Sequence, residues 1–196
     1  MIKAAREAID LLIQAGSSWQ FEDTRNGLRD REWIALRFLA RANRFSRTPS
    51  ALAEFVGTTR TTTSQLVKRL EDRGYVQRRT SDQDKRSVIL DVTSRGEKIL
   101  SSDPIAELVN AIATLEFGAN NFRDLLRHIL EQLNARQDHH HADNCRKCIF
   151  LTESAFKRAS GTLAEYECRF FRAGLNGSEL DLLCFNSERP AGGELQ

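Results

Sequence analysis

At Gly74 the spacing of apolar residues changes from the helical period to the alternation of strands. This change restricts the folds that the chain can adopt. Before Gly74, apolar residues recur every three or four positions, which is typical of amphipathic helices. After it, residues 76–80 and 87–92 alternate as strands do, and the polar residues 81–86 join them as a charged turn. The sequence therefore predicts a mainly helical chain with one small β-hairpin.

Four helices are predicted before the hairpin, over about 2–15, 30–39, 51–56 and 59–73. Asp30 and Ser50 stand where the second and third helices begin, and their short polar side chains can cap free backbone N–H groups. Gly57 is expected to end the third helix, and Thr58 or Thr59 to open the fourth. The third and fourth helices are thus separated by a tight turn.

Helices are also predicted after the hairpin. Thr93 can cap a helix from about residue 94, Pro104 is expected to bend or interrupt the apolar pattern, and another helix follows over about 120–135. The polar, His-rich segment 137–144 forms a boundary. Beyond it, the spacing of Phe156, Leu163, Tyr166 and Phe170 predicts helix, and Ser178 with Asp181 predicts a capped short helix over 179–185.

Charge is distributed unevenly along the chain. The formal net charge is +2, but residues 25–98 carry 17 Lys and Arg against 9 Asp and Glu. The remainder carries 12 basic against 18 acidic residues. A basic middle between acidic flanks suits a module that binds phosphates, although a basic solvated surface would give the same pattern.

Residues 30–98 closely resemble MarR-family transcription regulators. Segment 30–39 is similar to the family's second helix, and segments 52–57 and 62–76 are similar to its helix-turn-helix. Segment 82–86, followed by Leu90, Thr93 and Gly96, is similar to its wing and to the entry of the next helix. The resemblance implies a winged helix-turn-helix that binds double-stranded DNA, and it covers roughly residues 1–135.

The resemblance also implies a homodimer on a pseudo-palindromic operator, with half-sites about one DNA turn apart. It divides the chain into an N-terminal dimerisation helix and linker (1–29), a DNA-binding domain (30–97), dimerisation helices (98–138) and a cysteine-rich extension (139–196) that the usual family domain lacks. No phosphate-binding glycine loop, nucleophile elbow or catalytic triad spacing is present, so we expect no enzymatic activity.

The residues expected to contact DNA lie on the fourth helix and in the wing. Thr63, Leu66, Val67 and Leu70 share one helical face and should pack inward. Hydroxyl, amide and guanidinium groups on the other face can bond base edges or phosphates. The predicted contacts are Arg60, Thr61, Thr62, Ser64, Gln65, Lys68 and Arg69 on the helix, with Lys85 and Arg86 in the wing. Arg60, Thr62, Ser64 and Gln65 are the expected base readers, and Lys68 and Arg69 the expected phosphate contacts.

All four cysteines lie after residue 144, in the pattern C-x₂-C-x₁₉-C-x₁₅-C. Four thiolates can ligate an iron–sulfur cluster or a tetrahedral zinc ion. Because only Cys145 and Cys148 form a close pair, and apolar residues surround the four positions, an iron–sulfur cluster is favoured, with [4Fe–4S] before [2Fe–2S]. Structural zinc, and free or redox-active thiols, remain open alternatives for Cys145, Cys148, Cys168 and Cys184.

Two further features bear on this site. His139, His140 and His141 can bind a metal, but four thiols already complete a site and such a run is also typical of a solvated linker. Neither an apolar run of about 20 residues nor a signal-peptide pattern is present, so we expect a cytoplasmic protein without a membrane span. Thiols stay reduced in that compartment, which favours metal or redox chemistry over disulfides.

Overall fold

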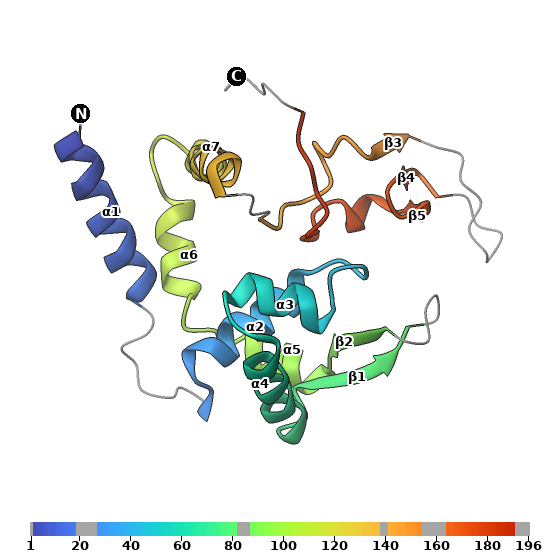
Figure 1. The fold of residues 1–196 in the computed structure, drawn as a ribbon. Helices are drawn as coiled ribbons and strands as arrows, with labels where there is room; N and C mark the ends of the chain where they lie inside the picture. Colours follow the sequence, from blue (N-terminus) through green and yellow to red (C-terminus); the bar gives the residue numbers. More distant parts are fainter. Residues whose placement is uncertain (1, 19–26, 82–86, 138–140, 154–163, 191–196) are drawn as a thin grey trace.

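The computed structural model describes residues 2–18, 27–81, 87–137, 141–153 and 164–190 (Figure 1). Its helices are α1 (Ile2–Ser17), α2 (Asp30–Arg41), α3 (Pro49–Val56), α4 (Arg60–Asp72), α5 (Ser94–Leu100), α6 (Ala106–Ala113), α7 (Ala119–Gln137) and the 3-10 turn η2 (Gly177–Glu179). Its strands are β1 (Val76–Thr80), β2 (Val88–Val92), β3 (Leu151–Glu153), β4 (Tyr166–Cys168) and β5 (Ala173–Leu175). The expected helix-turn-helix and hairpin are confirmed.

Local side chains explain where α3 and α4 begin and end. The Thr48 side chain accepts a hydrogen bond from the Ala51 N–H, so Thr48 caps α3 and the predicted cap at Ser50 is wrong. Pro49 then occupies the first turn, where its missing N–H costs nothing. Gly57 ends α3 with a φ of +65°, which glycine adopts without strain. Thr59 caps α4 by accepting from the Thr62 N–H, as one of the two predicted alternatives stated.

The flanking helices follow the same logic. Asp30 is the first residue of α2 and not its cap, because the cap position is Arg29, whose backbone N–H donates to the Glu32 carboxylate over 2.9 Å. Thr93 caps α5 by accepting from the Gly96 N–H, as predicted. The interruption expected at Pro104 is also confirmed, since α5 ends at Leu100 and α6 starts at Ala106.

The wing is a two-stranded antiparallel sheet. Its register pairs Val76 with Val92 and Thr80 with Val88. Val76, Ile89 and Leu90 are buried, whereas the rest of β1 is exposed. One end of the hairpin is therefore anchored in the helical body, while the strands extend beyond it (Figure 1).

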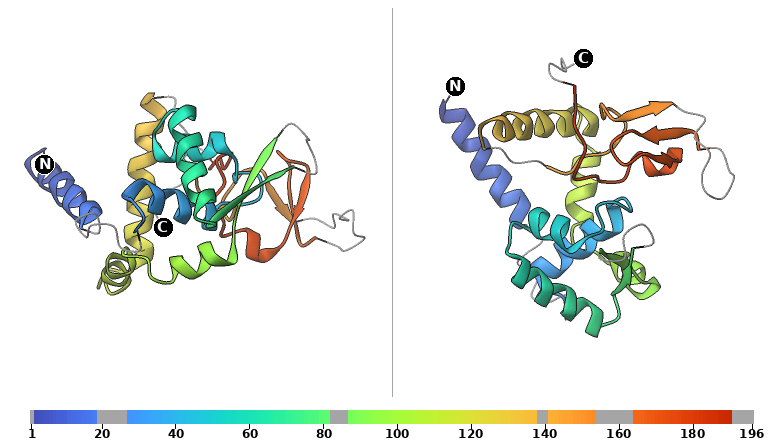
Figure 2. Two further views of the ribbon diagram at one scale, coloured as in Figure 1. Left: turned by 90° about the horizontal axis from the view of Figure 1, so that it is seen from below. Right: turned by 45° about the vertical axis from the view of Figure 1, so that its right-hand side comes forward.

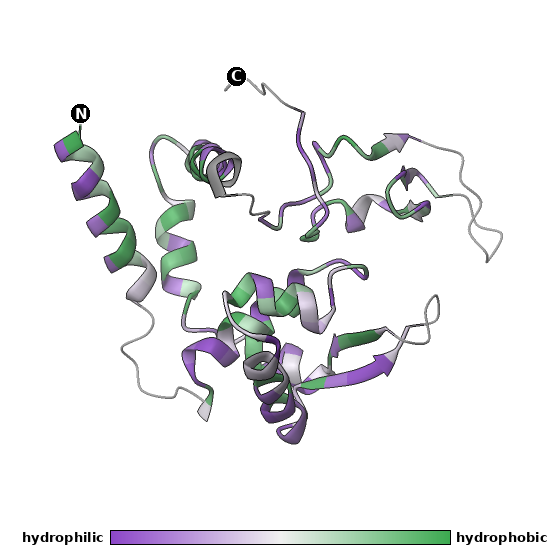
Figure 3. Ribbon diagram, viewed as in Figure 1, coloured by the Kyte–Doolittle hydropathy of each residue, from purple (hydrophilic) through white to green (hydrophobic). Residues whose placement is uncertain are grey.

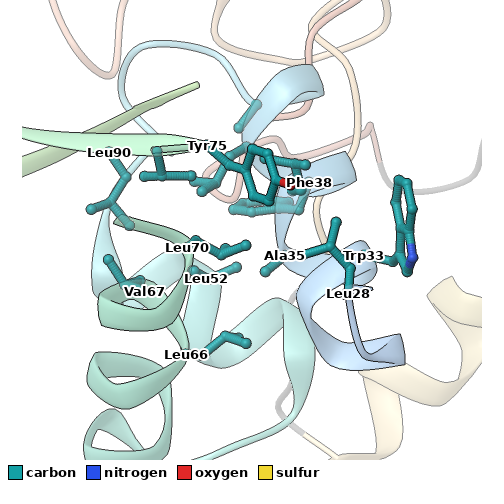
Figure 4. Close-up of a cluster of buried hydrophobic side chains, with 14 of the residues drawn as sticks. Leu28, Trp33, Ala35, Phe38, Leu52, Leu66, Val67, Leu70, Tyr75 and Leu90 are labelled. Carbon is teal, nitrogen blue, oxygen red and sulfur yellow. The ribbon is translucent and has the colours of Figure 1, made fainter. Parts of the chain in front are cut away.

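The winged helix encloses one apolar core. Leu36, Leu39, Leu52, Leu70 and Leu90 are each 0% exposed, and they come from four different elements. Figure 4 shows the side chains of α4 facing those of α2 and α3, with Tyr75 and Leu90 closing the cluster on the hairpin side. Burying one such side chain stabilises the fold by about 1.5–3 kcal/mol. This core fixes the orientation of α4.

Helices α1, α6 and α7 lie outside that core. No residue of α1 is buried, and its apolar residues Ile2 and Leu11 are 74% and 64% exposed. The two further views show α1 standing apart from the body, and the hydropathy colouring shows an apolar face along it (Figures 2 and 3). None of the described helices is both long and apolar enough to cross a bilayer.

The extension differs from its prediction. Its strands form a three-stranded antiparallel sheet in the order β3-β4-β5, so the helical extension predicted from apolar spacing is wrong. Tyr166 lies in β4 and Phe170 in the turn after it, while Phe156 and Leu163 fall outside the described residues. The predicted capped helix over 179–185 is also absent there, because the capping box joins Asn176 to Glu179 and holds only the 3-10 turn. Apolar spacing in this segment reflects packing around the cysteines and not helical turns.

Candidate nucleic-acid interface and metal centre

One face of α4 is exposed along its whole length. Thr63, Leu66, Val67 and Leu70 are buried, as predicted, and this places Ser64 and Gln65 on the opposite side. The residues of that side are exposed and polar or basic, and we call them the α4 stripe: Arg60, Thr61, Ser64, Gln65 and Lys68. Their spacing forms one continuous row on a helix, so they can enter a DNA groove together.

Thr62 and Arg69 flank the α4 stripe and already have partners within the chain. The Thr62 hydroxyl lies 3.0 Å from the Thr59 hydroxyl. The Arg69 Nε donates to the Glu32 Oε1 over 2.8 Å, and Glu32 is only 1% exposed. The Arg69 side chain is still 42% exposed, so the ion pair orients it at the surface. The predicted phosphate contact is therefore anchored by a buried carboxylate, which sequence reasoning missed.

A hollow of about 330 Å³ opens beside these residues. It is lined by Thr62, Leu66 and Arg69 of α4 and, from the start of α2, by Arg29 and Arg31 among others. Arg29 and Arg31 were not among the predicted contacts, because their sequence position gives no sign that they lie next to α4. The hollow is also lined by Asp30 and Glu32, so basic and acidic groups alternate where α2 begins.

The predicted wing residues Lys85 and Arg86 lie outside the described residues, as do Asp82, Gln83 and Asp84. The strands below them carry two further arginines. Arg78 Nε lies 2.9 Å from Glu71 Oε2, and Arg79 Nε lies 2.5 Å from Asp91 Oδ2, with both arginines at least 40% exposed. The carboxylates of Glu71 and Asp91 thus orient basic side chains in the wing.

Backbone hydrogen bonds bring the four cysteines into one region. Cys145 and Cys148 form a turn, in which the Cys148 N–H donates to the Cys145 carbonyl over 3.0 Å. Leu151 follows on β3 and pairs with Cys168 on β4. Cys184 pairs with Asp143, two residues before Cys145, through N–O distances of 2.8 and 3.2 Å. Four positions that are 39 residues apart at their extremes therefore meet at one end of the small sheet.

The thiols are free, and three of them are buried. The Cys145 thiol is hydrogen-bonded to the Cys184 sulfur, and this contact together with burial raises the pKa of Cys145. The same hydrogen bond lowers the pKa of Cys184, and donors from Asn43, Asn186 and Ser46 add to this effect against the opposing effect of burial. Cys184 is thus the thiol that its surroundings most favour as a thiolate.

Backbone N–H groups also point at a second sulfur. Burial raises the pKa of Cys168, and hydrogen bonds from the N–H groups of Phe171 and Phe170 act in the opposite direction. The turn that supplies them continues through Arg172, which has a left-handed φ of +49°. Backbone donors around sulfur support metal-bound thiolates, because they offset negative charge in an apolar site.

Four cysteine thiols in one region are suitable ligands for a thiolate-bound metal centre. Their side chains are nevertheless not arranged around one common position. Within the described ranges, no three His, Cys, Asp or Glu side chains are grouped as one bound metal ion requires. Cys145, Cys168 and Cys184 nevertheless belong to one buried cluster, and Cys148 lies in a turn with Cys145. Backbone contacts thus hold the four cysteines in one region.

Two alternatives to a four-cysteine centre are metal binding by the histidines and a redox-active dithiol. His139 and His140 lie outside the described residues, and His141 is half-buried, which lowers its pKa. The pair Cys145 and Cys148 is followed by a short strand of an antiparallel sheet. It therefore lacks the βαβ surroundings of a thioredoxin-type dithiol.

Comparisons with known proteins find similarity to the winged helix. Residues 26–87 match the model of the MarR family. The transcriptional repressor MprA of Escherichia coli K12 is 30% identical over 118 residues, a match that spans 57% of this chain and 64% of the repressor. The uncharacterized HTH-type transcriptional regulator YdcH of Bacillus subtilis is 34% identical over 86 residues, or 43% of this chain and 58% of that protein. This chain thus covers less than two thirds of either relative.

Solved structures extend the comparison to the fold. The transcriptional regulator PA3341 superposes with a TM-score of 0.53 at 28% identity, over 64% of this chain and 97% of that one. The regulator BldR of Sulfolobus solfataricus gives 0.51 at 23% identity, over 66% and 95%. The match to the family model ends before the first cysteine. Residues 26–87 are therefore similar to the MarR family, and the structure has the winged helix-turn-helix fold of MarR type.

Proposed function

We propose that this protein is a transcription regulator that binds double-stranded DNA through α4 and the wing. The observation that carries the proposal is the α4 stripe, an exposed row of polar and basic side chains on a helix whose other face is buried in the core. Side chains early in such a helix reach the groove floor, and later basic ones meet phosphates. MprA, which this chain resembles, is itself described as a transcriptional repressor.

The proposed active form is a homodimer. Helices α1, α6 and α7, which lie outside the core, carry many exposed apolar side chains. Such an apolar surface is typical of a protein–protein interface. The exposed side chains include Ile9, Leu11 and Ile13 of α1, Val109 of α6, and Leu125, Ile129, Leu130 and Leu133 of α7, all at least 40% exposed. A second copy that covers them would hold two α4 helices for two half-sites of a pseudo-palindromic operator.

A selection of bound DNA from a random library, followed by titration of the selected operator, tests this proposal. Arg60→Ala and Gln65→Ala should each weaken operator binding by about 1–3 kcal/mol, and random DNA much less, because base contacts discriminate between sequences. Lys68→Ala should weaken both alike and reduce the salt slope by about one. Equal losses on operator and random DNA for all three variants would contradict the assigned reading face.

We further propose that Cys145, Cys148, Cys168 and Cys184 ligate an iron–sulfur cluster, with [4Fe–4S] favoured over [2Fe–2S], through which the regulator senses iron, oxygen or redox state in the cytoplasm. Support comes from the backbone donors to sulfur and from the apolar shell of Phe45, Phe150, Phe171 and Leu175. Such a cluster would supply one-electron redox chemistry.

Structural zinc is the second candidate, and one observation favours it. The tight Cys145–Cys148 turn leads into a short antiparallel sheet, and turns of this kind present two sulfurs to one tetrahedral ion. Zinc would crosslink the extension and leave sensing to a small-molecule effector elsewhere. Both candidates use the same four thiolates and differ in whether the centre can change its redox state.

Anaerobic purification with metal and sulfide analysis separates the candidates. Brown protein with iron and acid-labile sulfide supports the cluster, and colourless protein with stoichiometric zinc supports the crosslink. Cys145→Ser, Cys148→Ser, Cys168→Ser and Cys184→Ser should each lower metal content, because a hydroxyl replaces a thiolate poorly. Full loading of Cys184→Ser would contradict the four-cysteine site, and the matched variant His141→Ala should load normally.

A further inference from the structure

Two polar side chains of the winged helix are buried but are not part of its apolar core. Asn43 and Ser46 are 2% and 1% exposed, and both lie in the loop Ala42–Thr48 between α2 and α3, which we call the connector loop. A buried polar group costs stability unless it is hydrogen-bonded. The partners of Asn43 and Ser46 therefore indicate what the connector loop is built to hold.

Those partners lie in the extension, on both sides of Cys184. The Asn43 N–H donates to the Leu183 carbonyl over 2.8 Å, and the Leu183 N–H donates to the Arg41 carbonyl over 2.7 Å. On the other side, the Phe185 N–H donates to the Ser46 Oγ over 3.0 Å. The backbone on both sides of Cys184 is thus held by the connector loop and the end of α2, while Cys184 itself pairs with Asp143 of the extension.

The two side chains also act on the Cys184 thiol. The Asn43 Oδ1 accepts from the N–H groups of Phe45 and Ser46 at 3.1 and 3.0 Å, which leaves the amide nitrogen free to act as a donor. After the Cys145 side chain, hydrogen bonding from the Asn43 and Ser46 side chains contributes to the lowered pKa of Cys184. Side chains of the DNA-binding domain therefore favour the thiolate form of a proposed metal ligand in the extension.

Neighbouring contacts strengthen this junction. The rings of Phe45 and Phe171 stack with centroids 4.0 Å apart and an interplanar angle of 6°. The Arg44 guanidinium donates to Glu179 Oε1 over 2.8 Å and to the Gly174 carbonyl over 2.7 Å. Figure 1 shows the extension lying directly along the connector loop. Movement around the cysteines would consequently act on this loop.

The far side of the connector loop contacts the DNA-binding elements. The Leu90 N–H of β2 donates to the Arg47 carbonyl over 2.7 Å, and Arg47 Nη1 lies 3.5 Å from Asp91 Oδ1. Thr48 ends the loop and caps α3, which packs against α4. One seven-residue loop therefore contacts the thiol centre on one side and both the wing and the helix-turn-helix on the other.

We propose that Asn43 and Ser46 are positioning residues for the Cys184 thiolate, and that the connector loop transmits the metal state of the four cysteines to the helix-turn-helix and wing. The inference rests on the proposed metal centre and the proposed DNA binding. Outer hydrogen-bond partners orient a ligand and increase its affinity for metal, and their loss typically weakens metal binding about 10–100-fold.

The first test is anaerobic titration of the full-length, metal-free protein with Co²⁺, read from the thiolate-to-cobalt charge-transfer absorption. Ser46→Ala removes the hydroxyl, and Asn43→Asp keeps the Oδ1 acceptor while it removes the amide donor. Both should bind Co²⁺ about 10–100-fold more weakly than the wild type. Ser46→Thr restores a hydroxyl and should recover most of the affinity. Thr63→Val is the matched control, because Thr63 is equally buried but lies in α4, away from the cysteines.

The second test is the ratio of operator affinities of Co²⁺-loaded and metal-free protein. That ratio should move toward one in Ser46→Ala and Asn43→Asp and keep its wild-type value in Thr63→Val. If both variants match the wild type in Co²⁺ affinity and in this ratio, the inference is wrong. If Ser46→Ala does not fold, Asn43→Asp decides, because it preserves the turn of the loop. Wild-type protein that binds no Co²⁺, or no operator, would instead contradict the proposed function.

Discussion

The winged helix and the cysteine extension are held together by different means. The winged helix buries leucines from α2, α3, α4 and β2 in one apolar core, and its helices carry their own caps. Among the described residues of the extension, the buried cluster is small, and three of its five members are cysteines. The described strands have three residues each. A region this small rarely buries enough apolar surface to fold alone, so it relies on contacts with its neighbour, and the proposed metal would add further stability.

The difference shows how a regulator can acquire a sensory module while its DNA-binding domain keeps its own fold. The apolar core keeps the winged helix folded whatever the state of the thiols. The extension contacts that domain through the connector loop and the end of α2, so a metal-dependent change in the extension would act on the winged helix there.

Metal removal should produce the largest difference between the two regions, in the protection of their backbone amides. Chelation under reducing conditions should abolish amide protection in the described residues 141–153 and 164–185, because binding of a structural metal can contribute about 10–16 kcal/mol to the folding of a thiolate site. Residues of α2–α5 should keep theirs. Hydrogen exchange followed by mass spectrometry measures both regions in one sample, and full protection of the extension without metal would contradict the comparison.

Leu70→Ala should affect the opposite region. Leu70 is 0% exposed at the centre of the winged helix, so the cavity should lower the free energy of unfolding of that domain by about 2–5 kcal/mol. Thermal or urea unfolding monitors the change, and metal content should stay stoichiometric. Val88→Ala is the matched control, because Val88 is 38% exposed and its truncation should cost less than about 0.5 kcal/mol.

Asp143→Asn should loosen the extension in a way that depends on pH. Asp143 is 2.6 Å from Arg127 of α7 and 2.8 Å from Arg189. Burial alone would raise its pKa, but the Asn144 N–H and the two guanidiniums hold the pKa of Asp143 below its ordinary value of 3.8. Its folded-state pKa is thus depressed, so its stabilisation is complete above pH 3.8 and is lost as the pH falls through the folded value.

The substitution should cost about 1–3 kcal/mol at pH 7, because two arginines lose a buried partner. It should also remove the part of the acid sensitivity that arises below pH 3.8. Unfolding curves of both metal-loaded proteins between pH 2.5 and 7 test this, because any loss of metal in acid affects the two proteins alike. An identical acid dependence of the two proteins would show that Asp143 does not tie the extension to α7.

Arg146→Ala should have the smallest effect. Arg146 forms a bidentate pair with Asp181 at the surface of the extension, and both side chains are more than half exposed. Ion pairs of this kind are screened by water and salt and contribute little. Unchanged melting temperature and metal affinity are expected, and a clear loss of either would mean that surface charge, and not the thiols, holds the extension together.

Sequence patterns predicted the winged helix well because its determinants are local. The inward face of α4, the stop at Gly57 and the hairpin strands follow from periodicity and turn chemistry, and the structure confirms them. The cysteine region was predicted as helical because Tyr166 and Phe170 are four residues apart. Its strands are only three residues long, too short to show an alternating pattern.

The junction between the regions was not predictable from the sequence. Asn43 and Ser46 are ordinary polar residues of a loop, and nothing local indicates that they are buried against residues about 140 positions later. The anchoring of Arg69 by Glu32 is likewise a contact between distant segments. Such pairs depend on tertiary structure, whereas the grouping of cysteines at the end of the chain is visible in the sequence itself.

The most direct test of a thiol centre that controls DNA binding is one titration of wild-type protein. Metal-loaded and metal-free forms of a single anaerobic preparation are titrated against the labelled operator at fixed salt, with the dimer state checked in parallel. Their affinities should differ about 5–150-fold, the usual range for coupled sites, with the loaded form binding more tightly because a bound centre orders the extension. Identical affinities, with both forms dimeric, would contradict control by the cysteines and reduce their site to a structural crosslink.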